Sequence, residues 1–211
     1  DTNFTSADIS NATLTSAIIT RTNFDKANLS SVIATSSTFT DVVATDADFT
    51  YANLTGSKLT NGDFQGASLL LTHFDNGTII GTDFRNAIMQ YATFTSATLT
   101  DPNWESTDLT GVNFTSATLT RPEAKDADFT SAYFGKTTTT NMNASNGLFD
   151  NATIKNSTFT KLTAPQASML GITIDWSDLG GAQLQSSDLS GSTIKGSNFT
   201  SGNMSNSEFK N

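Results

Sequence analysis

Residues 108–120 read Asp-Leu-Thr-Gly-Val-Asn-Phe-Thr-Ser-Ala-Thr-Leu-Thr, and this stretch decides the fold. Its bulky residues Leu109, Phe114 and Leu119 lie five apart, a spacing that fits neither the 3.6-residue period of an α-helix nor the two-residue period of a strand. A fixed internal period indicates a repeat architecture. The five-residue unit therefore has to be followed along the whole chain.

The period runs unbroken from Phe4 to Phe209. All 15 Phe residues lie in this series, and most of its other positions, which we call centres, carry Leu, Ile, Met or Trp. A small residue usually lies two positions before a centre, as at Ala7 and Ala12. The centres that lack a bulky side chain are Ala34, Ala44, Ala124, Thr139, Ala144 and Ala164. Because the period leaves no room for a linker, we expect residues 1–211 to form one continuous domain.

Runs such as Ala27-Asn28-Leu29-Ser30-Ser31 and Ala52-Asn53-Leu54-Thr55-Gly56 resemble the pentapeptide-repeat family over the full chain. The resemblance implies an all-β fold, a right-handed quadrilateral β-helix in which four five-residue sides make one coil of 20 residues. It also implies that the centre and the residue two before it point inward, and that the other three point outward. At roughly 4.8 Å between stacked strands, the expected ten to eleven coils make a rod about 50 Å long, without a capping helix.

Exchange of side-chain volume supports a shared interior independently of the resemblance. Where the centre shrinks to Ala, the residue two before it often grows, as in Val32 with Ala34 and Met142 with Ala144. A close-packed core requires such exchange. The same exchange occurs in Val42 with Ala44, Pro122 with Ala124, and Leu162 with Ala164.

Composition narrows the environment and the partners of the protein. The net charge of −9 disfavours binding to nucleic acid or to anionic membranes, and no apolar run is long enough to span a bilayer. The absence of Cys excludes disulfides and thiol chemistry. The chain begins with Asp1 rather than Met, as a processed protein or a fragment would, and we expect an extracellular or otherwise exported protein.

No group of residues predicts catalysis, a metal site or a cofactor. The single histidine, His73, lies beside Asp75 at an outward position, with no second His and no Cys to complete a metal site. The many Asp residues follow the repeat rather than converge, and a rod with a filled interior has no pocket for a substrate. We therefore do not expect an enzyme.

Sorting the outward residues by coil gives one side rich in threonine, whose centres are residues 19, 39, 59 and every twentieth residue onward. We call it the threonine face; Lys58 and Asp178 are its only charges beside the centres. One interpretation is that Thr suits β-strands and that stacked Thr ladders stabilise them. The other is a flat binding face, because the pattern is similar to the Thr-x-Thr arrays of β-helical ice-binding proteins, whose hydroxyls and methyls match ice-lattice spacings. The candidate residues are Thr38, Thr40, Thr98, Thr100, Thr118, Thr120, Thr138, Thr140, Thr158 and Thr160.

The opposite side repeats an acidic residue immediately before its centres, at Asp8, Asp48, Asp108, Asp128, Asp188 and Glu208. Stacked like charges cost stability, and gyrase-protecting members of the family are acidic rods that mimic duplex DNA. A DNA-mimicking inhibitor is therefore one hypothesis. Against it, Asn28, Ser68, Ile88, Leu148 and Ser168 interrupt the column, and the chain lacks the C-terminal dimerising helix of those relatives.

An apolar cluster, the lateral apolar patch, lies on and beside the same side, with Tyr51, Leu71 and Tyr91 spaced by 20 along one corner. A contiguous exposed patch indicates a partner, whereas scattered exposed apolar residues need no explanation. Both interpretations stay open. The full patch is Tyr51, Leu70, Leu71, Ile88 and Tyr91.

Eleven Asn-x-Ser/Thr sequons occur, and the repeat itself creates seven of them by placing Asn before a centre and Ser or Thr after it. They are therefore weak evidence for glycosylation. In a secreted eukaryotic protein, the most accessible sequons would be the corner residues Asn11, Asn76, Asn151 and Asn156.

The repeat continues into both terminal coils, which would leave core residues and backbone groups uncovered. We therefore expect self-association through end-to-end stacking, with lateral contacts as a further option. Such heterologous contacts build filaments when they do not close. The leading hypothesis is a non-catalytic scaffold or filament rod, followed by ice binding and then by DNA mimicry. The end-stacking residues would be Phe4, Ile9, Leu14, Ile19, Ile194, Phe199, Met204 and Phe209.

Overall fold

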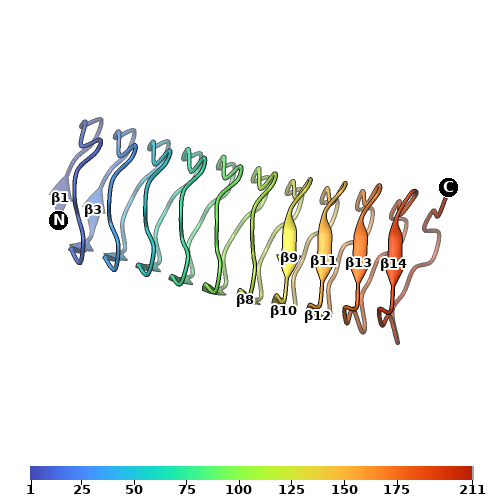
Figure 1. The fold of residues 1–211 in the computed structure, drawn as a ribbon. Coiled ribbons are helices and arrows are strands. Elements are labelled where there is room, and N and C mark those ends of the chain that lie inside the picture. Colours follow the sequence, from blue (N-terminus) through green and yellow to red (C-terminus); the bar gives the residue numbers. More distant parts are fainter. Residues whose placement is uncertain (211) are drawn as a thin grey trace.

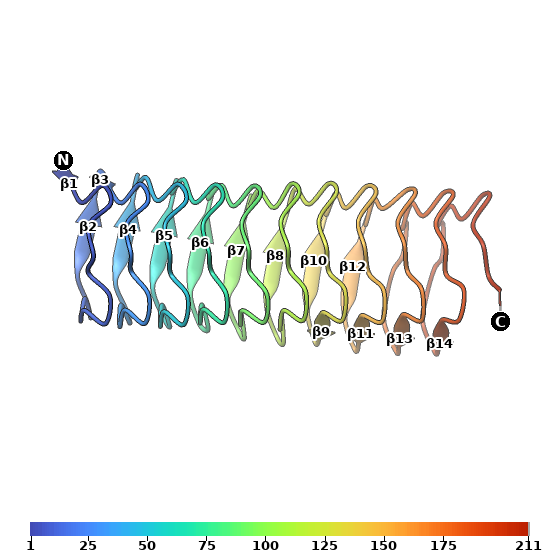
Figure 2. The same cartoon turned by 90° about the horizontal axis from the view of Figure 1, so that it is seen from above.

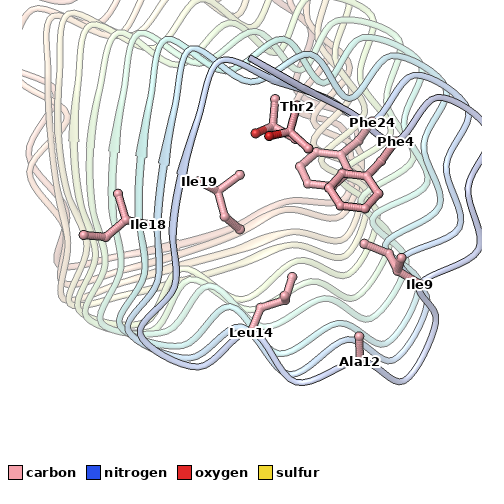
Figure 3. Close-up of a pocket in the computed structure, with 9 residues that line it drawn as sticks. Thr2, Phe4, Ile9, Ala12, Leu14, Ile18, Ile19 and Phe24 are labelled. Carbon is pink, nitrogen blue, oxygen red and sulfur yellow. The ribbon is translucent and has the colours of Figure 1, made fainter.

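The computed structural model describes residues 1–210, which wind into one rod of stacked coils (Figure 1). Seen from the N-terminal end, the chain passes clockwise through Phe4, Ile9, Leu14 and Ile19 and then recedes, so the coil is right-handed (Figure 3). The predicted quadrilateral β-helix is thus confirmed. The last residue of the predicted span, Asn211, lies outside the described residues.

Fourteen short strands, all paired in parallel, make three sheets within residues 1–210. Paired strands are 20 residues apart in the sequence, for example Thr98 with Thr118, which confirms the 20-residue coil. A two-stranded sheet contains β1 (Thr2–Asn3) and β3 (Thr22–Asn23). An eight-stranded sheet contains β2 (Ile18–Thr20), β4 (Thr38–Thr40), β5 (Lys58–Thr60), β6 (Thr78–Ile80), β7 (Thr98–Thr100), β8 (Thr118–Thr120), β10 (Thr138–Thr140) and β12 (Thr158–Thr160). A four-stranded sheet contains β9 (Tyr133–Gly135), β11 (Thr153–Lys155), β13 (Thr173–Asp175) and β14 (Thr193–Lys195).

The interior is filled by the two predicted inward positions of each repeat. Both members of the exchanging pairs are buried, as in Val32 with Ala34 and Met142 with Ala144. Phenylalanine rings stack from coil to coil: the centroid distance is 4.9 Å between Phe74 and Phe94, and 5.1 Å between Phe94 and Phe114. The rod is therefore held together by contacts between successive coils, as expected of a solenoid.

Every corner of the rod has the same backbone conformation. The residue two after each centre, from Ser6 to Asn206, has a positive φ. Gly, Asn and Asp tolerate this left-handed conformation best, yet Tyr51, Leu71 and Trp176 also adopt it. The repeat therefore imposes the corner even on bulky residues.

The sides of the rod come in two forms, and within residues 1–210 an Asp or Asn before the centre occurs only in the form without a three-residue strand, although other residues there, such as Ile33 and Thr93, also form isolated bridges alone. Where the residue before the centre is Asp or Asn, its side-chain oxygen accepts a hydrogen bond from the N–H of the residue after the centre, as from Thr130 to Asp128 at 2.8 Å. Where the side is a three-residue strand, the residue after the centre pairs with its counterpart in the next coil, as Thr120 does with Thr140. Within residues 1–210, none of the twelve three-residue strands begins with Asp or Asn.

This distinction explains why the long sheet ends where it does. The eight-stranded sheet occupies the threonine face up to β12, after which Asp178 and Asn198 take the position before the centre and bond the N–H groups of Gly180 and Thr200. The four-stranded sheet begins on the preceding side at β9, so strand pairing moves from one side of the rod to the next along the chain (Figures 1 and 2).

Candidate binding surfaces

The threonine face is the most extensive sheet of the molecule, and its strands lie side by side in a row (Figure 2). Parallel pairing aligns Thr98, Thr118 and Thr138 in one ladder, and Thr100, Thr120 and Thr140 in a second. The first ladder is exposed in these three coils and the second is half-buried. The remaining predicted residues continue the ladders: Thr38, Thr40, Thr158 and Thr160. Lys58 and Ile80 interrupt them.

The side formed by β9, β11, β13 and β14 also consists of three-residue strands, so its composition can be compared with that of the threonine face. In β11, β13 and β14 the residue after the centre is Lys155, Asp175 or Lys195. Strand geometry in this rod thus accepts charged residues at that position. The uncharged residues of the threonine face are therefore not a consequence of strand conformation alone.

The acidic residues that repeat immediately before the centres, which we call the acidic column, take part in hydrogen bonds within the turns. Asp48, Asp108 and Asp128 each accept a hydrogen bond from the backbone N–H two residues on, at 2.8–3.0 Å. Hydrogen bonds from Ser190 lower the pKa of Asp188, and hydrogen bonds from Ser10 lower that of Asp8. A carboxyl with a lowered folded-state pKa adds stability above its unfolded pKa, and this stability is lost as the pH falls through the folded value. The column thus has a structural role in addition to its charge.

The lateral apolar patch follows one corner, as its spacing predicts. Tyr51 and Tyr91 are exposed at the corner and Leu71 there is half-buried, while the half-buried Leu70 and the exposed Ile88 lie together on the side that precedes this corner. A Cβ on Gly111 would lie 2.6 Å from two ring atoms of Tyr91, so this ring leans over the following coil. Part of the apolar surface of Tyr91 therefore packs on Gly111 of the same molecule.

The sequon asparagines fall into two structural groups. Those before a centre, such as Asn53 and Asn113, use their amide oxygen in the turn hydrogen bond. The four corner asparagines, at 11, 76, 151 and 156, are exposed. Asn3, Asn198 and Asn203, which precede centres in the terminal coils, are exposed as well, so exposure does not single out the corner asparagines, and glycosylation stays a prediction.

The terminal coils expose core residues. Phe4 is 36% exposed at the N-terminal end, and Ile194 and Phe209 are 39% and 55% exposed near the C-terminal end. A hollow of about 360 Å³ opens at the N-terminal coil, with Phe4, Ile9, Leu14 and Ile19 around it (Figure 3). The other predicted end residues, Ile9, Leu14, Ile19, Phe199 and Met204, are partly buried and pack against the core.

A family model described as pentapeptide repeats matches eight segments: residues 1–33, 22–61, 37–76, 52–90, 67–103, 92–121, 103–135 and 176–211. The chain belongs to the pentapeptide-repeat family. Comparison with curated proteins gives no match.

Two solved pentapeptide-repeat structures are similar to this chain over most of its length. A trypsin-treated variant of QnrB1, a plasmid-mediated fluoroquinolone resistance protein, is 18% identical, with a TM-score of 0.52 over 92% of this chain and 90% of the other. HetL, involved in heterocyst differentiation regulation in the cyanobacterium Nostoc sp. strain PCC 7120, is 18% identical, with a TM-score of 0.41 over 95% and 86%. At 18% identity and this TM-score, the likeness to QnrB1 concerns the fold alone.

Pentapeptide-repeat proteins are generally non-catalytic. His73 bonds the Thr93 hydroxyl through Nδ1 at 3.0 Å, and this nitrogen lies 4.0 Å from Asp75. Within residues 1–210, no group of three or more His, Cys, Asp and Glu side chains is arranged to hold a metal ion. The same residues contain no helix that is long and apolar enough to cross a membrane.

Sequence reasoning missed one surface of this pentapeptide-repeat protein. The side formed by β9, β11, β13 and β14 carries lysines and exposed aromatic rings, which we call the lysine–aromatic surface: Tyr133, Lys136, Lys155, Trp176 and Lys195. The sequence contained the information needed to find this surface. Sorting the outward residues of this one side by coil places these side chains together.

Proposed function

We propose that this protein is a non-catalytic rod that binds ice through its threonine face. The observation that carries the proposal is the run of four adjacent strands, β7, β8, β10 and β12, with Thr on both sides of every centre. Strands in one sheet lie roughly 4.8 Å apart and alternate residues of a strand about 7 Å apart. The face therefore presents a regular two-dimensional lattice of hydroxyl and methyl groups.

Two properties of the lattice suit it to binding an ordered, uncharged surface. It is free of charge across the four strands, although the net charge of the chain is −9. It also belongs to a packed core, because Leu99, Leu119 and Phe159 beneath it are fully buried. A rigid support keeps the threonines in place, which lowers the entropic cost of binding an ordered surface.

A thermal hysteresis measurement tests the proposal. Wild-type protein at millimolar concentration should lower the freezing point relative to the melting point, and Thr118→Tyr should lose most of this effect because its ring stands out from the face. Tyrosine is compatible with the strand backbone, since Tyr133 occupies the same position in β9. The Tyr133 ring lies on Gly135, whereas β8 has Thr120 at that position, which keeps a ring at 118 from lying flat.

Thr153→Tyr is the matched control, because Thr153 holds the same position in β11 on another side. It should keep the wild-type effect. Absence of hysteresis in the wild type, or equal values for the two variants, would rule out ice binding.

The exposed terminal coils favour a second function, end-to-end assembly of rods into a scaffold or filament. Copies stacked in phase would place Phe4 on Met204 and Ile9 on Phe209, apolar residue on apolar residue, with the parallel ladder continuing between copies. Burial of such side chains is worth roughly 1.5–3 kcal/mol each. An exported scaffold of this kind would be consistent with the composition.

Negative-stain electron microscopy of the 211-residue chain tests assembly. Rods should lengthen with concentration in steps of about 50 Å, and Ile9→Asp should leave single rods. Thr13→Asp, at an exposed position of the same coil, is the control and should leave the lengthened rods unchanged. Single rods of the wild type at all concentrations would contradict assembly.

The third interpretation, DNA mimicry, draws little support from the acidic column. The column is interrupted, and its aspartates serve the turns, as Asp108 and Asp128 do. A gyrase supercoiling assay tests it directly.

A further inference from the structure

The lysine–aromatic surface is unlike the rest of the rod. Lys136, Lys155 and Lys195 bring three positive charges to one side of a chain whose net charge is −9. The only acid in the outward positions of the strands there is Asp175, whose carboxylate lies 3.7 Å from the Lys155 ammonium. Local charge is therefore positive. The strands of this side, β9, β11, β13 and β14, lie at the front in Figure 1.

Two aromatic rings on this surface lie against the backbone instead of projecting from it. A Cβ on Gly196 would lie 2.6–2.8 Å from three ring atoms of Trp176, so the indole covers this glycine in the next coil. The Tyr133 ring covers Gly135 of its own strand in the same manner. Trp176 is nevertheless 60% exposed and Tyr133 is 40% exposed. Each ring thus turns one face to the protein and the other to solvent.

The coil geometry spaces these groups regularly. Tyr133 and Trp176 lie two coils apart, which corresponds to about 10 Å along the rod. Lys155 and Lys195 are separated by the same two coils, because β11, β13 and β14 are paired in register. A shallow hollow of about 380 Å³ lies beside Tyr133, and Lys136, Lys155 and Asn156 line it.

We propose that the lysine–aromatic surface binds an anionic polysaccharide along the rod. The exposed ring faces would stack on sugar rings, the ammonium groups would pair with carboxylates or sulfates, and Asn156 would bond hydroxyls in the hollow. An open side of the rod, with no wall at either end of the four strands, accommodates a long chain.

Duplex DNA fits this surface less well. DNA carries one negative charge per roughly 1.7 Å, so three lysines neutralise little of it, and the acidic remainder of the rod repels it. A sparsely charged sugar chain experiences less repulsion and gains more from ring stacking.

Affinity electrophoresis in gels containing polygalacturonate tests the proposal, with gels containing a neutral glucan and a duplex DNA band-shift assay alongside. The wild type should bind polygalacturonate, more weakly as salt is added. Trp176→Asn should weaken binding about tenfold, the equivalent of one stacking contact, and should fold because Asn156 occupies the same corner position with positive φ. Lys136→Gln with Lys195→Gln should weaken binding and reduce its salt dependence.

Two controls keep the test specific. Tyr91→Asn removes a ring that also leans on a corner glycine, on another corner, and Lys26→Gln with Lys161→Gln removes two positive charges elsewhere. Both should bind as the wild type does. No binding by the wild type, stronger binding to DNA than to polygalacturonate, or equal losses in the controls and the Trp176 variant would overturn the proposal. Thermal melting of every variant separates lost binding from lost folding.

Discussion

The Asp or Asn before a centre shows how a single residue selects the conformation of one side. Its side-chain oxygen satisfies the N–H of the residue after the centre, as Asn113 does for Thr115 at 2.9 Å. In the strands that N–H belongs to a residue paired with the next coil, and Thr, Lys, Tyr or Ile stands before the centre. Asp and Asn compete with strand pairing through such local hydrogen bonds, whereas β-branched Thr favours it.

Two substitutions of Asp128 test this role at the residue scale. Asp128→Ala should lower the free energy of unfolding by about 1 kcal/mol, because the Thr130 N–H loses its acceptor. Asp128→Asn keeps the acceptor and removes a like charge beside Asp108, so it should be neutral or slightly stabilising. Denaturant unfolding of the three proteins gives the comparison; equal losses in both variants would assign the effect to charge instead.

At the scale of the element, the corners are the positions with the strictest backbone requirement. Gly111 has a φ of 67° and supports the Tyr91 ring. Gly181 has a φ of 75°, and a Cβ added there would meet no atom within 4 Å. The two glycines therefore share a conformation and differ in their surroundings.

Replacing each glycine by alanine separates the two effects. Gly181→Ala should cost about 1 kcal/mol from the left-handed conformation alone, and Gly111→Ala should cost more because its Cβ meets the Tyr91 ring. Combining Gly111→Ala with Tyr91→Asn should remove the difference. Thermal or denaturant unfolding measures all four proteins, and equal costs for the two alanine variants would show that the ring does not press on Gly111.

The sequence predicted the core of each element and not the form of each side. The five-residue period identified the inward positions, including exchanges such as Leu162 with Ala164, because close packing constrains them residue by residue. The transfer of strand pairing from the threonine face to the side of β9 was not predicted. It depends on whether the residue after a centre bonds a side chain through its N–H or pairs with the next coil. Asp178 and Asn198 mark the end of the eight-stranded sheet. Residue type alone does not mark the start of the four-stranded sheet, because His73 and Thr93 on that side form only isolated bridges.

At the scale of the whole molecule, the repeat makes a rod with a filled interior, so function has to reside on its outer sides or its ends. The acidic column and the Thr array were both visible in the sequence because residues 20 apart share a side. The lysine–aromatic surface was missed because its lysines and rings occupy different positions of the repeat, such as Lys155 after a centre and Trp176 at a corner. A single column of residues spaced by 20 therefore does not reveal this surface, and all the outward positions of that side have to be sorted together.

The central claim is that the threonine face, rather than the fold as such, gives this rod its function. Thermal hysteresis of the wild type, Thr118→Tyr and Thr153→Tyr tests it most directly. Ice binding through this face predicts hysteresis in the wild type and in Thr153→Tyr, with most of it lost in Thr118→Tyr. A wild type without hysteresis, or a Thr118→Tyr variant as active as the wild type, would contradict the claim.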